Sequence, residues 1–176
     1  MRTFEKISFE QFKKDIGDDK ELYDSLKLPS RETKYAAGYD LYADEDATIW
    51  PETNELIHTG IAIEIPEGYF GAIYARSGLA SKQSLRPANC VGVIDSDYRG
   101  QVCVCIHNDN PYRVVQISEE EGRPLISAPI QDREIKKGDR IAQLVIQKFE
   151  PVTFEEVDEL SETVRGEGGF GSTGKN

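Results

Sequence analysis

The sequence predicts a single domain built mainly of β-strands, of the sandwich or barrel type. Short runs of alternating β-branched and polar residues recur from Pro29 onward, at a spacing of roughly 8 to 12 residues. Glycine and proline separate these runs, and no long helical pattern follows residue 28. A chain of 176 residues fits one domain with a substantial core.

The formal net charge of −11 excludes one class of partner. Proteins that track nucleic-acid polymers need a basic face, so we expect no nucleic-acid partner. A small phosphorylated ligand is compatible with this charge, because a few amides and guanidinium groups suffice to hold it. No apolar run approaches the ~20 residues of a membrane helix, and the N-terminus lacks a signal-peptide pattern. We therefore expect no membrane association and a cytoplasmic, or otherwise intracellular, location.

The three cysteines are Cys90, Cys103 and Cys105. Cys103 and Cys105 would face the same way on a strand, but a metal site needs more ligands nearby. We interpret all three as small buried apolar residues in a reducing compartment.

Residues 1–28 differ from the rest of the chain and predict a helical extension. Ser8 fits a helix N-cap, with Gln11 in the reciprocal position. Apolar residues such as Phe12 recur at helical spacing, and a second short helix is expected after Gly17. We expect one or two amphipathic helices packed on the β domain.

Alternating patterns then predict a series of strands. Two of them carry a polar residue in an apolar register, Asp40 in the first and Gln143 in the last. The predicted strands cover residues 37–43, 48–51, 55–60, 61–65, 69–75 and 140–146.

The segment Gly92–Gly100 predicts a β-hairpin, and its turn carries more reactive and charged side chains than turn formation requires. Its arms are residues 91–94 and 102–106, and both are rich in β-branched residues. The turn holds two carboxylates, Asp95 and Asp97, beside a tyrosine and an arginine. Taken alone, such a turn is either a catalytic corner or a solvated loop.

Two further segments interrupt the strands. Residues 75–82 are polar, contain Gly78 and predict a helical turn, which serves either as an anion site or as a plain capped loop. Residues 107–137 form a long connection, for which we expect an extended hairpin insert with an acidic tip at 119–121.

The C-terminal residues 161–176 are rich in glycine and follow an acidic, linker-like stretch. Their glycine spacing approaches the dinucleotide and phosphate-loop motifs, but neither match has the helix that such motifs require. Ordering about ten such residues costs on the order of 10 kcal/mol, so a functional tail closes only over a ligand. In that case Phe170 would be an apolar lid, and Arg165, Ser172 and Thr173 would bind phosphates. The alternative is a disordered terminus.

Taken together, five segments resemble the five motifs of the trimeric dUTP pyrophosphatase (dUTPase) family, in the family's order. The chain departs from the family pattern in the N-terminal extension and in residues 107–137. The matching segments are residues 37–43, 76–80, 92–100, 138–143 and 165–174.

The resemblance implies an all-β, jelly-roll-like fold of the β-clip type over residues 1–160, with a flexible arm at 161–176. It implies a homotrimer with three active sites at subunit interfaces, in which the arm of one subunit covers a site built by its neighbours. It also implies that dUTP is hydrolysed to dUMP and pyrophosphate, which keeps uracil out of DNA. Mg²⁺ would ride on the triphosphate and its waters without direct protein ligands.

The resemblance also assigns roles to the base and sugar side of the site. Asp95 would orient and deprotonate the attacking water. Tyr98 would lie under the deoxyribose and leave no room for a 2′-hydroxyl. Asn89, with the main chain at Val93, Ile94 and Cys103, would read uracil.

On the phosphate side, the resemblance assigns phosphate binding to a segment, a strand and the arm. Asp40 would lie near the water shell of the metal or serve as a buried partner of an arginine. Phe170 would stack over uracil. The residues expected on phosphates are Arg76, Ser77, Gly78, Gln143, Arg165, Ser172 and Thr173.

Two other functions are weighed. A related family with the same fold deaminates dCTP, but it uses a glutamate and lacks the Asp-Ser-Asp-Tyr turn seen at residues 95–98. The third hypothesis is a nucleotide-gated interaction module in which residues 1–28 and 107–137 bind a protein partner.

Overall fold

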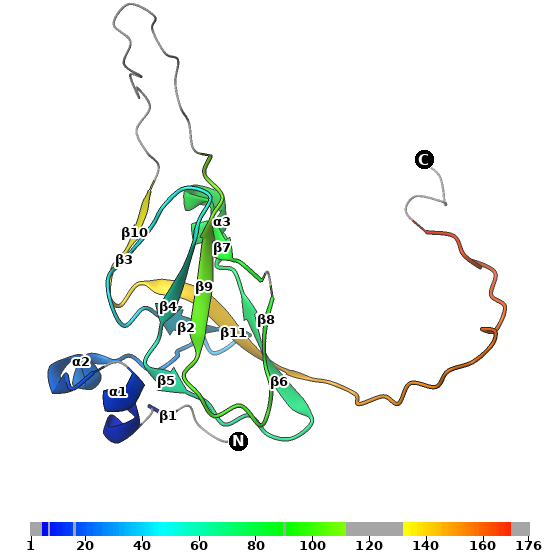
Figure 1. Cartoon of the computed structure of the whole chain (residues 1–176), viewed down its shortest axis with the longest axis horizontal. Coiled ribbons are helices and arrows are strands. Elements are labelled where there is room, and N and C mark those ends of the chain that lie inside the picture. Colours follow the sequence, from blue (N-terminus) through cyan, green and yellow to red (C-terminus); the bar gives the residue numbers. More distant parts are fainter. Residues whose placement is uncertain (1–4, 7, 16, 90, 112–131, 170–176) are drawn as a thin grey trace, which may run out of the picture.

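The computed structural model describes residues 5–6, 8–15, 17–89, 91–111 and 132–169, and these form a mainly β domain (Figure 1). The all-β prediction is confirmed, and each strand predicted within the described residues is present with bounds shifted by a few residues. The elements are β1 (Glu5–Lys6), α1 (Phe9–Asp15), α2 (Lys20–Ser25), β2 (Tyr39–Tyr42), β3 (Ala47–Ile49), β4 (Asn54–His58), β5 (Ile61–Ala62), β6 (Tyr69–Tyr74), α3 (Ser77–Gln83), β7 (Leu85–Pro87), β8 (Gly92–Ile94), β9 (Cys103–Asn108), β10 (Arg133–Ile135) and β11 (Arg140–Lys148).

The strands form four small antiparallel sheets among the described residues. The strand orders are β2-β11-β6-β8, β4-β9-β7, β1-β5 and β10-β3. Alternate side chains of β9 enter the core: Val104 and Ile106 are buried, whereas Cys103 and Cys105 are half-buried. Period-two alternation therefore places one face of this strand in the core.

The N-terminal extension packs as α1 and α2 against one end of the β domain (Figure 1). The predicted cap of α1 is confirmed, since Ser8 Oγ accepts a hydrogen bond from the Gln11 N–H at 3.2 Å. Phe12 is fully buried and forms a small cluster with Leu26. Gly60 approaches Leu26 so closely that a Cβ there would collide with its side chain.

The hairpin predicted around Gly92–Gly100 is wrong. β8 pairs with β6, whereas β9 pairs with β4 and β7, so the two arms belong to different sheets. The segment that pairs with β9 lies further back in the chain, and its last bond runs from the Ala88 N–H to the Cys105 carbonyl oxygen at 2.7 Å. Alternation identifies strands but does not identify their partners, and this connection is too long to impose a tight turn.

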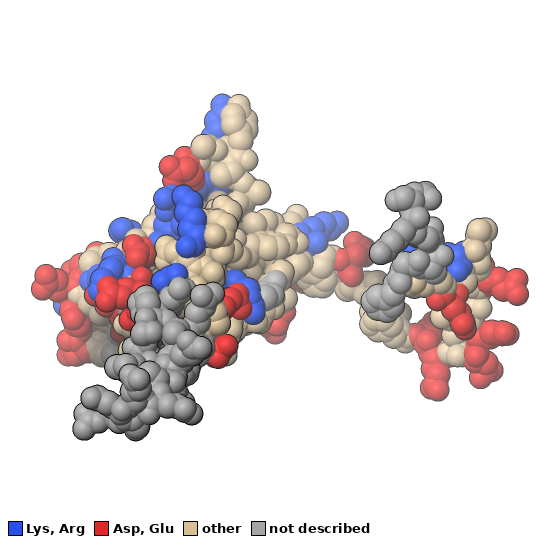
Figure 2. Space-filling model, turned by 90° about the horizontal axis from the view of Figure 1, so that it is seen from above, with Lys and Arg blue, Asp and Glu red and all other residues tan. Residues whose placement is uncertain are grey.

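Beyond this bond the two segments diverge, one leading into β8 and the other coming back into β9. We call residues 89–104, which form both arms and the turn between them, the fork. Residues 149–169, by contrast, form no strand and run away from the body of the domain (Figure 1). Acidic side chains gather along this terminal stretch, as Figure 2 shows. The predicted hairpin of the 107–137 insert falls mostly on 112–131, outside the described residues.

The cysteine prediction is partly wrong. Cys103 and Cys105 do share one face of β9, and neither forms a disulfide with a described residue, but both are half-buried because that face points away from the core. Cys90 lies outside the described residues. Among the helices that the structure describes, none has the length and hydropathy needed to cross a bilayer.

Candidate active site

The fork carries the residues predicted to read the base. On one arm, Val93 is 62% exposed and lies on β8, whose outer edge has no partner strand among the described residues. On the other arm, Cys103 begins β9 beyond the end of β7. Backbone groups that no strand pairs are available to bind the edge of a base.

Asn89 and Ile94 lie on the same arm as Val93. Asn89 is exposed, and a Cβ at Gly92 would lie 3.2 Å from its Nδ2, so glycine permits this close approach. The Ile94 side chain is 7% exposed and belongs to the core. Only the backbone of Ile94 can therefore contact a ligand, whereas Asn89 offers its side-chain amide.

The turn between the arms presents Asp95 and Tyr98. Asp95 follows β8 directly and is exposed, and its carbonyl oxygen accepts a hydrogen bond from the Tyr98 N–H at 3.2 Å. Tyr98 is 44% exposed, and its hydroxyl donates to the Gln101 carbonyl oxygen at 2.8 Å. A Cβ at Gly100 would lie 2.7 Å from Cζ of Tyr98, so glycine lets the ring lie over the backbone. The turn thus offers a carboxylate and a phenol ring to a ligand.

A second group of predicted residues centres on Asp40 of β2, which is 4% exposed. Arg76 Nε donates to Asp40 Oδ1 at 3.0 Å, and Arg140 Nη1 donates to Oδ2 at 3.3 Å. The Asp40 carboxylate raises the pKa of Arg140. Of the two roles predicted for Asp40, the contacts show the arginine partner, and a place near a metal's water shell stays a prediction.

Gln143 lies beside this ion cluster. On β11 it is opposite Asp40 of β2 on one side and Tyr74 of β6 on the other. Ser77 and Gly78 open α3 immediately after Arg76 and are exposed. The predicted phosphate-binding residues of the domain therefore lie together; we call them the phosphate-side group, which consists of Asp40, Arg76, Ser77, Gly78 and Gln143.

Within one chain, the phosphate-side group lies far from the fork turn. Ile94 is paired with Gly71, so Asp95 lies level with the start of β6, whereas Arg76 follows its end. Six residues at about 3.3 Å each place the two groups about 20 Å apart along the strand. The structure therefore assembles two half-sites and does not join them.

The predicted arm residues are only partly described. Arg165 is exposed, and its Nε donates to the Gly168 carbonyl oxygen at 2.7 Å. Phe170, Ser172 and Thr173 lie outside the described residues. Their roles over uracil and on the phosphates stay predictions.

The described residues contain no group of three or more His, Cys, Asp or Glu side chains arranged to hold a metal ion. Both Asp40 oxygens accept hydrogen bonds from arginines. This donor set suits an ion held by phosphates and water better than one held by protein ligands.

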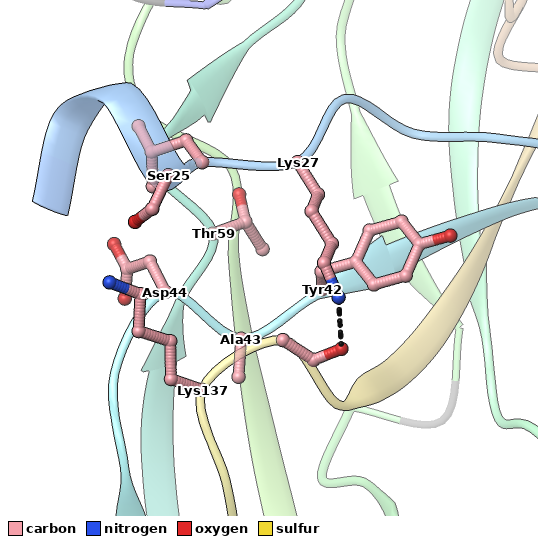
Figure 3. Close-up of a pocket in the computed structure, with 9 residues that line it drawn as sticks. Ser25, Lys27, Tyr42, Ala43, Asp44, Thr59 and Lys137 are labelled. Carbon is pink, nitrogen blue, oxygen red and sulfur yellow. Dashed lines mark hydrogen bonds between the residues drawn. The ribbon is translucent and has the colours of Figure 1, made fainter.

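A cavity of about 270 Å³ lies away from both half-sites, between the end of α2 and the β domain (Figure 3). Asp44 lines it, is 3% exposed, and neither of its carboxylate oxygens has a hydrogen-bond partner among the described residues. Burial raises the pKa of Asp44, and Glu45 adds to this effect, whereas His58 and Lys137 oppose it. The oxygens are sealed from solvent, so Asp44 belongs to the seam with the extension and not to the active site.

Three residues near the predicted site went unnoticed in the sequence. Arg140 lies inside the fourth matching segment, and its position before an apolar strand gave the one available signal. His58 and Gln101 contact each other next to Tyr98, with His58 Nδ1 2.7 Å from Gln101 Oε1. They are 43 residues apart, so only the strand register brings them together.

The dUTPase family model matches residues 24–119 and 125–174 of this chain. A deoxyuridine 5′-triphosphate nucleotidohydrolase from Corynebacterium glutamicum is 47% identical over 150 residues, which cover 85% of this chain and 89% of that protein. Among solved structures, the Staphylococcus bacteriophage 80alpha dUTPase with dUPNHPP is similar at a TM-score of 0.70 and 35% identity, covering 85% of this chain and 92% of that one. A mutant dUTPase from phage phi11 of S. aureus, which coordinates a structural Mg(II) ion, is similar at a TM-score of 0.60 and 33% identity, covering 76% and 90%. These matches span both half-sites and the C-terminal arm, and the chain therefore belongs to the dUTPase family.

Proposed function

We propose that this chain is a dUTP diphosphatase, which hydrolyses dUTP to dUMP and pyrophosphate. The observation that carries the proposal is the fork turn, where the exposed Asp95 carboxylate lies three residues before the exposed Tyr98 ring. Both lie within the part of the chain that matches the family model. The names of the relatives and the nucleotide in the phage structure support the same substrate.

In this mechanism Asp95 orients a water molecule and accepts its proton. The water oxygen forms a bond to the α-phosphorus, and the bond from that phosphorus to the oxygen bridging to the β-phosphorus breaks. Pyrophosphate then leaves with the bonding electrons. A positioned base of this kind typically contributes about 10²–10⁴ in rate.

Substrate selection is assigned to the remaining fork residues. Tyr98 packs under the deoxyribose, and Asn89 with the backbone of Val93, Ile94 and Cys103 reads uracil. Arg76, Ser77, Gly78 and Gln143 bind the phosphates. The arm closes over the ligand, with Phe170 on the base and Arg165, Ser172 and Thr173 on the outer phosphates.

Mg²⁺ is proposed to enter with the substrate. When bound with the substrate, it would neutralise charge that develops on the leaving pyrophosphate. Asp40, the carboxylate of the phosphate-side group, is engaged by two arginines, which agrees with an ion held by the substrate.

The separation of the half-sites supports a homotrimer with sites at its interfaces. The fork turn of one subunit would meet the phosphate-side group of another, since about 20 Å of strand separates them within one chain. Exposed apolar side chains also favour further copies: Val93 is 62% exposed, and Phe154 is 92% exposed.

The test is turnover of purified protein with dUTP and Mg²⁺, followed by release of pyrophosphate. We expect Asp95→Asn to lower kcat by about 10²–10⁴-fold while dUTP still binds, because only the base is lost. Asp97→Asn is the matched control: it removes a second exposed carboxylate from the same turn and should retain turnover. Full activity of the Asp95 variant would contradict its assignment.

Two alternatives are decided by the same assay. A panel of dUTP, dTTP, UTP and dCTP tests base and sugar selection together, and ammonia release from dCTP would indicate a deaminase. The interaction-module hypothesis stays a prediction, because most of the 107–137 insert lies outside the described residues. Pull-down with and without nucleotide tests it.

A further inference from the structure

The fork turn is exposed and short of packing, so the position of Tyr98 needs another support. Its hydroxyl donates to the backbone carbonyl of Gln101 at 2.8 Å, which makes Gln101 the residue that holds the ring. The ring position thus depends on where the Gln101 backbone lies.

Gln101 is itself tied to a neighbouring strand. Its side-chain Oε1 lies 2.7 Å from Nδ1 of His58, the last residue of β4. His58 is paired with Cys103 in the β4–β9 register, and its Nδ1 lies 3.4 Å from Cys103 Sγ. A hydrogen bond joins Gln101 to His58 whichever way round the amide lies, because Nδ1 donates to Oε1 or accepts from Nε2.

The Gln101 side chain lowers the stability of the fold relative to an apolar residue. As placed, its Nε2 is buried with no hydrogen-bond partner among the described residues. A buried donor without a partner is destabilising, whereas an apolar side chain of similar size would avoid that cost. A residue kept against this cost is a candidate for a functional role.

We infer that His58 and Gln101 are positioning residues for sugar selection, an inference that rests on the proposed function. Through the Gln101 carbonyl, the pair fixes the position of the Tyr98 ring relative to Cys103 at the start of β9. In the proposed function the Tyr98 ring packs under the deoxyribose, and the Cys103 backbone is one of the contacts to the base. The pair touches neither substrate nor Asp95, so its loss affects KM and the preference for dUTP over UTP more than kcat.

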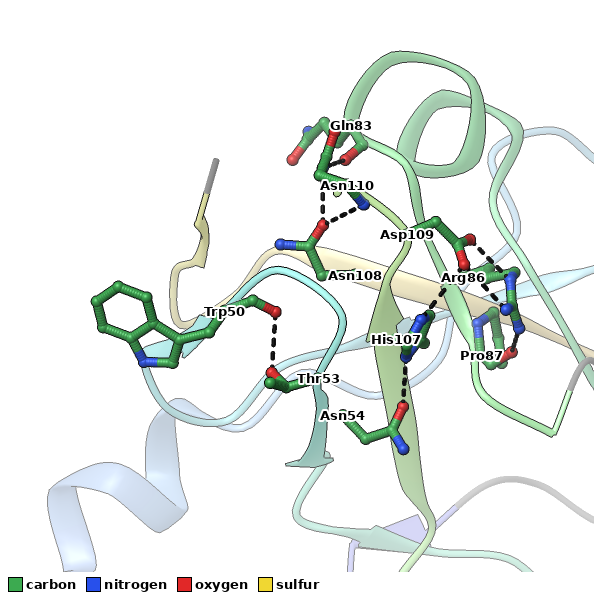
Figure 4. Close-up of polar contacts among 10 residues, drawn as sticks. All are labelled: Trp50, Thr53, Asn54, Gln83, Arg86, Pro87, His107, Asn108, Asp109 and Asn110. Atoms are coloured by element: carbon green, nitrogen blue, oxygen red, sulfur yellow. Dashed lines mark hydrogen bonds and ion pairs between the residues drawn. The ribbon is translucent and has the colours of Figure 1, made fainter. Parts of the chain in front are cut away.

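The chain offers a matched control at the other end of the same strand pair. His107 of β9 lies with Nδ1 2.7 Å from Asn54 Oδ1 of β4, the same histidine–amide contact at the same distance (Figure 4). His107 also lies 3.4 Å from Asp109, which Arg86 binds. This second pair is remote from Tyr98 because it is at the opposite end of β9.

The experiment compares His58→Leu and Gln101→Met with His107→Leu. We expect each of the first two to raise KM for dUTP by about three- to tenfold and to lower the dUTP/UTP ratio of kcat/KM, with kcat nearly unchanged. His107→Leu should leave KM and the ratio unchanged. His58→Asn should restore both values, since its amide offers a hydrogen-bonding group near the position of Nδ1.

Two readouts separate positioning from damage to the fold. Gln101→Met should retain or raise the thermal midpoint, because it removes the unpartnered amide. The double variant should be no worse in KM than either single variant, because both act through one contact. Unchanged KM and sugar preference in His58→Leu and Gln101→Met would overturn the inference, as would additive losses. Failure of this inference can be distinguished from failure of the proposed function, because in the second case the parent protein would not hydrolyse dUTP.

Discussion

At the scale of single residues, Asp44 and Asp46 lie two positions apart in opposite environments. Burial raises the pKa of Asp44. Hydrogen bonds from the Lys137 backbone and the Lys136 side chain lower the pKa of Asp46. The two residues should therefore give stability opposite dependences on pH.

We expect Asp44→Asn to unfold at a higher urea concentration than the parent at pH 7. A carboxyl whose pKa is raised by folding contributes stability below its unfolded value of 3.8 and loses it as pH rises through the folded pKa. The advantage of the variant should thus shrink as pH falls toward 4. The charged groups facing this carboxyl are Glu45, His58, Lys137 and, across the cavity, Lys27 (Figure 3).

Asp46→Asn is the control with the opposite sign. Its lowered pKa contributes stability above 3.8, which is lost as pH falls through the folded pKa. This variant should therefore be less stable than the parent at pH 7 and approach it in acid. Urea titrations from pH 7 to below pH 3.8 give both curves, and parallel curves for the two variants would contradict the assignment.

The Asp40 cluster leads to a second prediction at this scale. Asp40→Asn leaves Arg76 and Arg140 without their shared carboxylate, and the free energy of unfolding should fall by about 1.5–3 kcal/mol. Glu32→Gln removes only the exposed partner of Arg140 and should cost about 0–1 kcal/mol. Urea denaturation of both variants measures the difference, and equal losses would show that burial of Asp40 has no energetic consequence.

At the scale of elements, the sequence predicted strands well and their partners poorly. The β11 prediction, with Gln143 at its centre, holds because apolar alternation is a local property. The hairpin at the fork was wrong because β8 joins β6, and partner choice depends on contacts remote in sequence. For the same reason, the sequence predicted an arginine partner as one of two roles for Asp40 but did not identify Arg76 as that arginine.

The docking of the N-terminal extension depends on one glycine. Gly60 has φ +66° and a Cβ there would collide with Leu26, which belongs to the small cluster that holds α1 and α2. Gly60→Ala should therefore cost about 1–3 kcal/mol through overpacking, in addition to strain at positive φ. Hydrogen exchange should become faster in residues 8–26.

Gly68→Ala is the matched control for this prediction. Gly68 has φ +80° but nothing lies within 4 Å of its Cβ position, so the substitution introduces strain without a collision. It should lower stability without selectively exposing the extension. If both variants accelerate exchange in α1 and α2 equally, contact with Leu26 does not hold the extension in place.

At the scale of the whole molecule, the proposed trimer accounts for the separation of the two half-sites and the arm within one chain. Residues 149–164 run away from the domain and are exposed, with apolar side chains such as Val152 and Leu160 uncovered. Such a segment has too little contact with its own domain to be held by it. In the proposed trimer, a neighbouring subunit would give this segment a surface to pack on, and the arm would reach a site built by other subunits.

This arrangement predicts complementation between two inactive proteins. One carries Asp95→Asn with an intact arm, and the other ends at residue 164 with an intact Asp95. Each alone should have little activity, but subunits mixed in equal amounts and reassembled should regain roughly a quarter of parental turnover, because one site in four combines an intact Asp95 with an intact arm from another subunit. Light scattering should give three times 19.8 kDa for the parent, and a slightly smaller mass of three subunits for the mixture, because half of its subunits lack residues 165–176. No recovery in a mixture of that mass would mean that each arm serves its own fork, and a mass of one subunit with full activity would rule out the interface site.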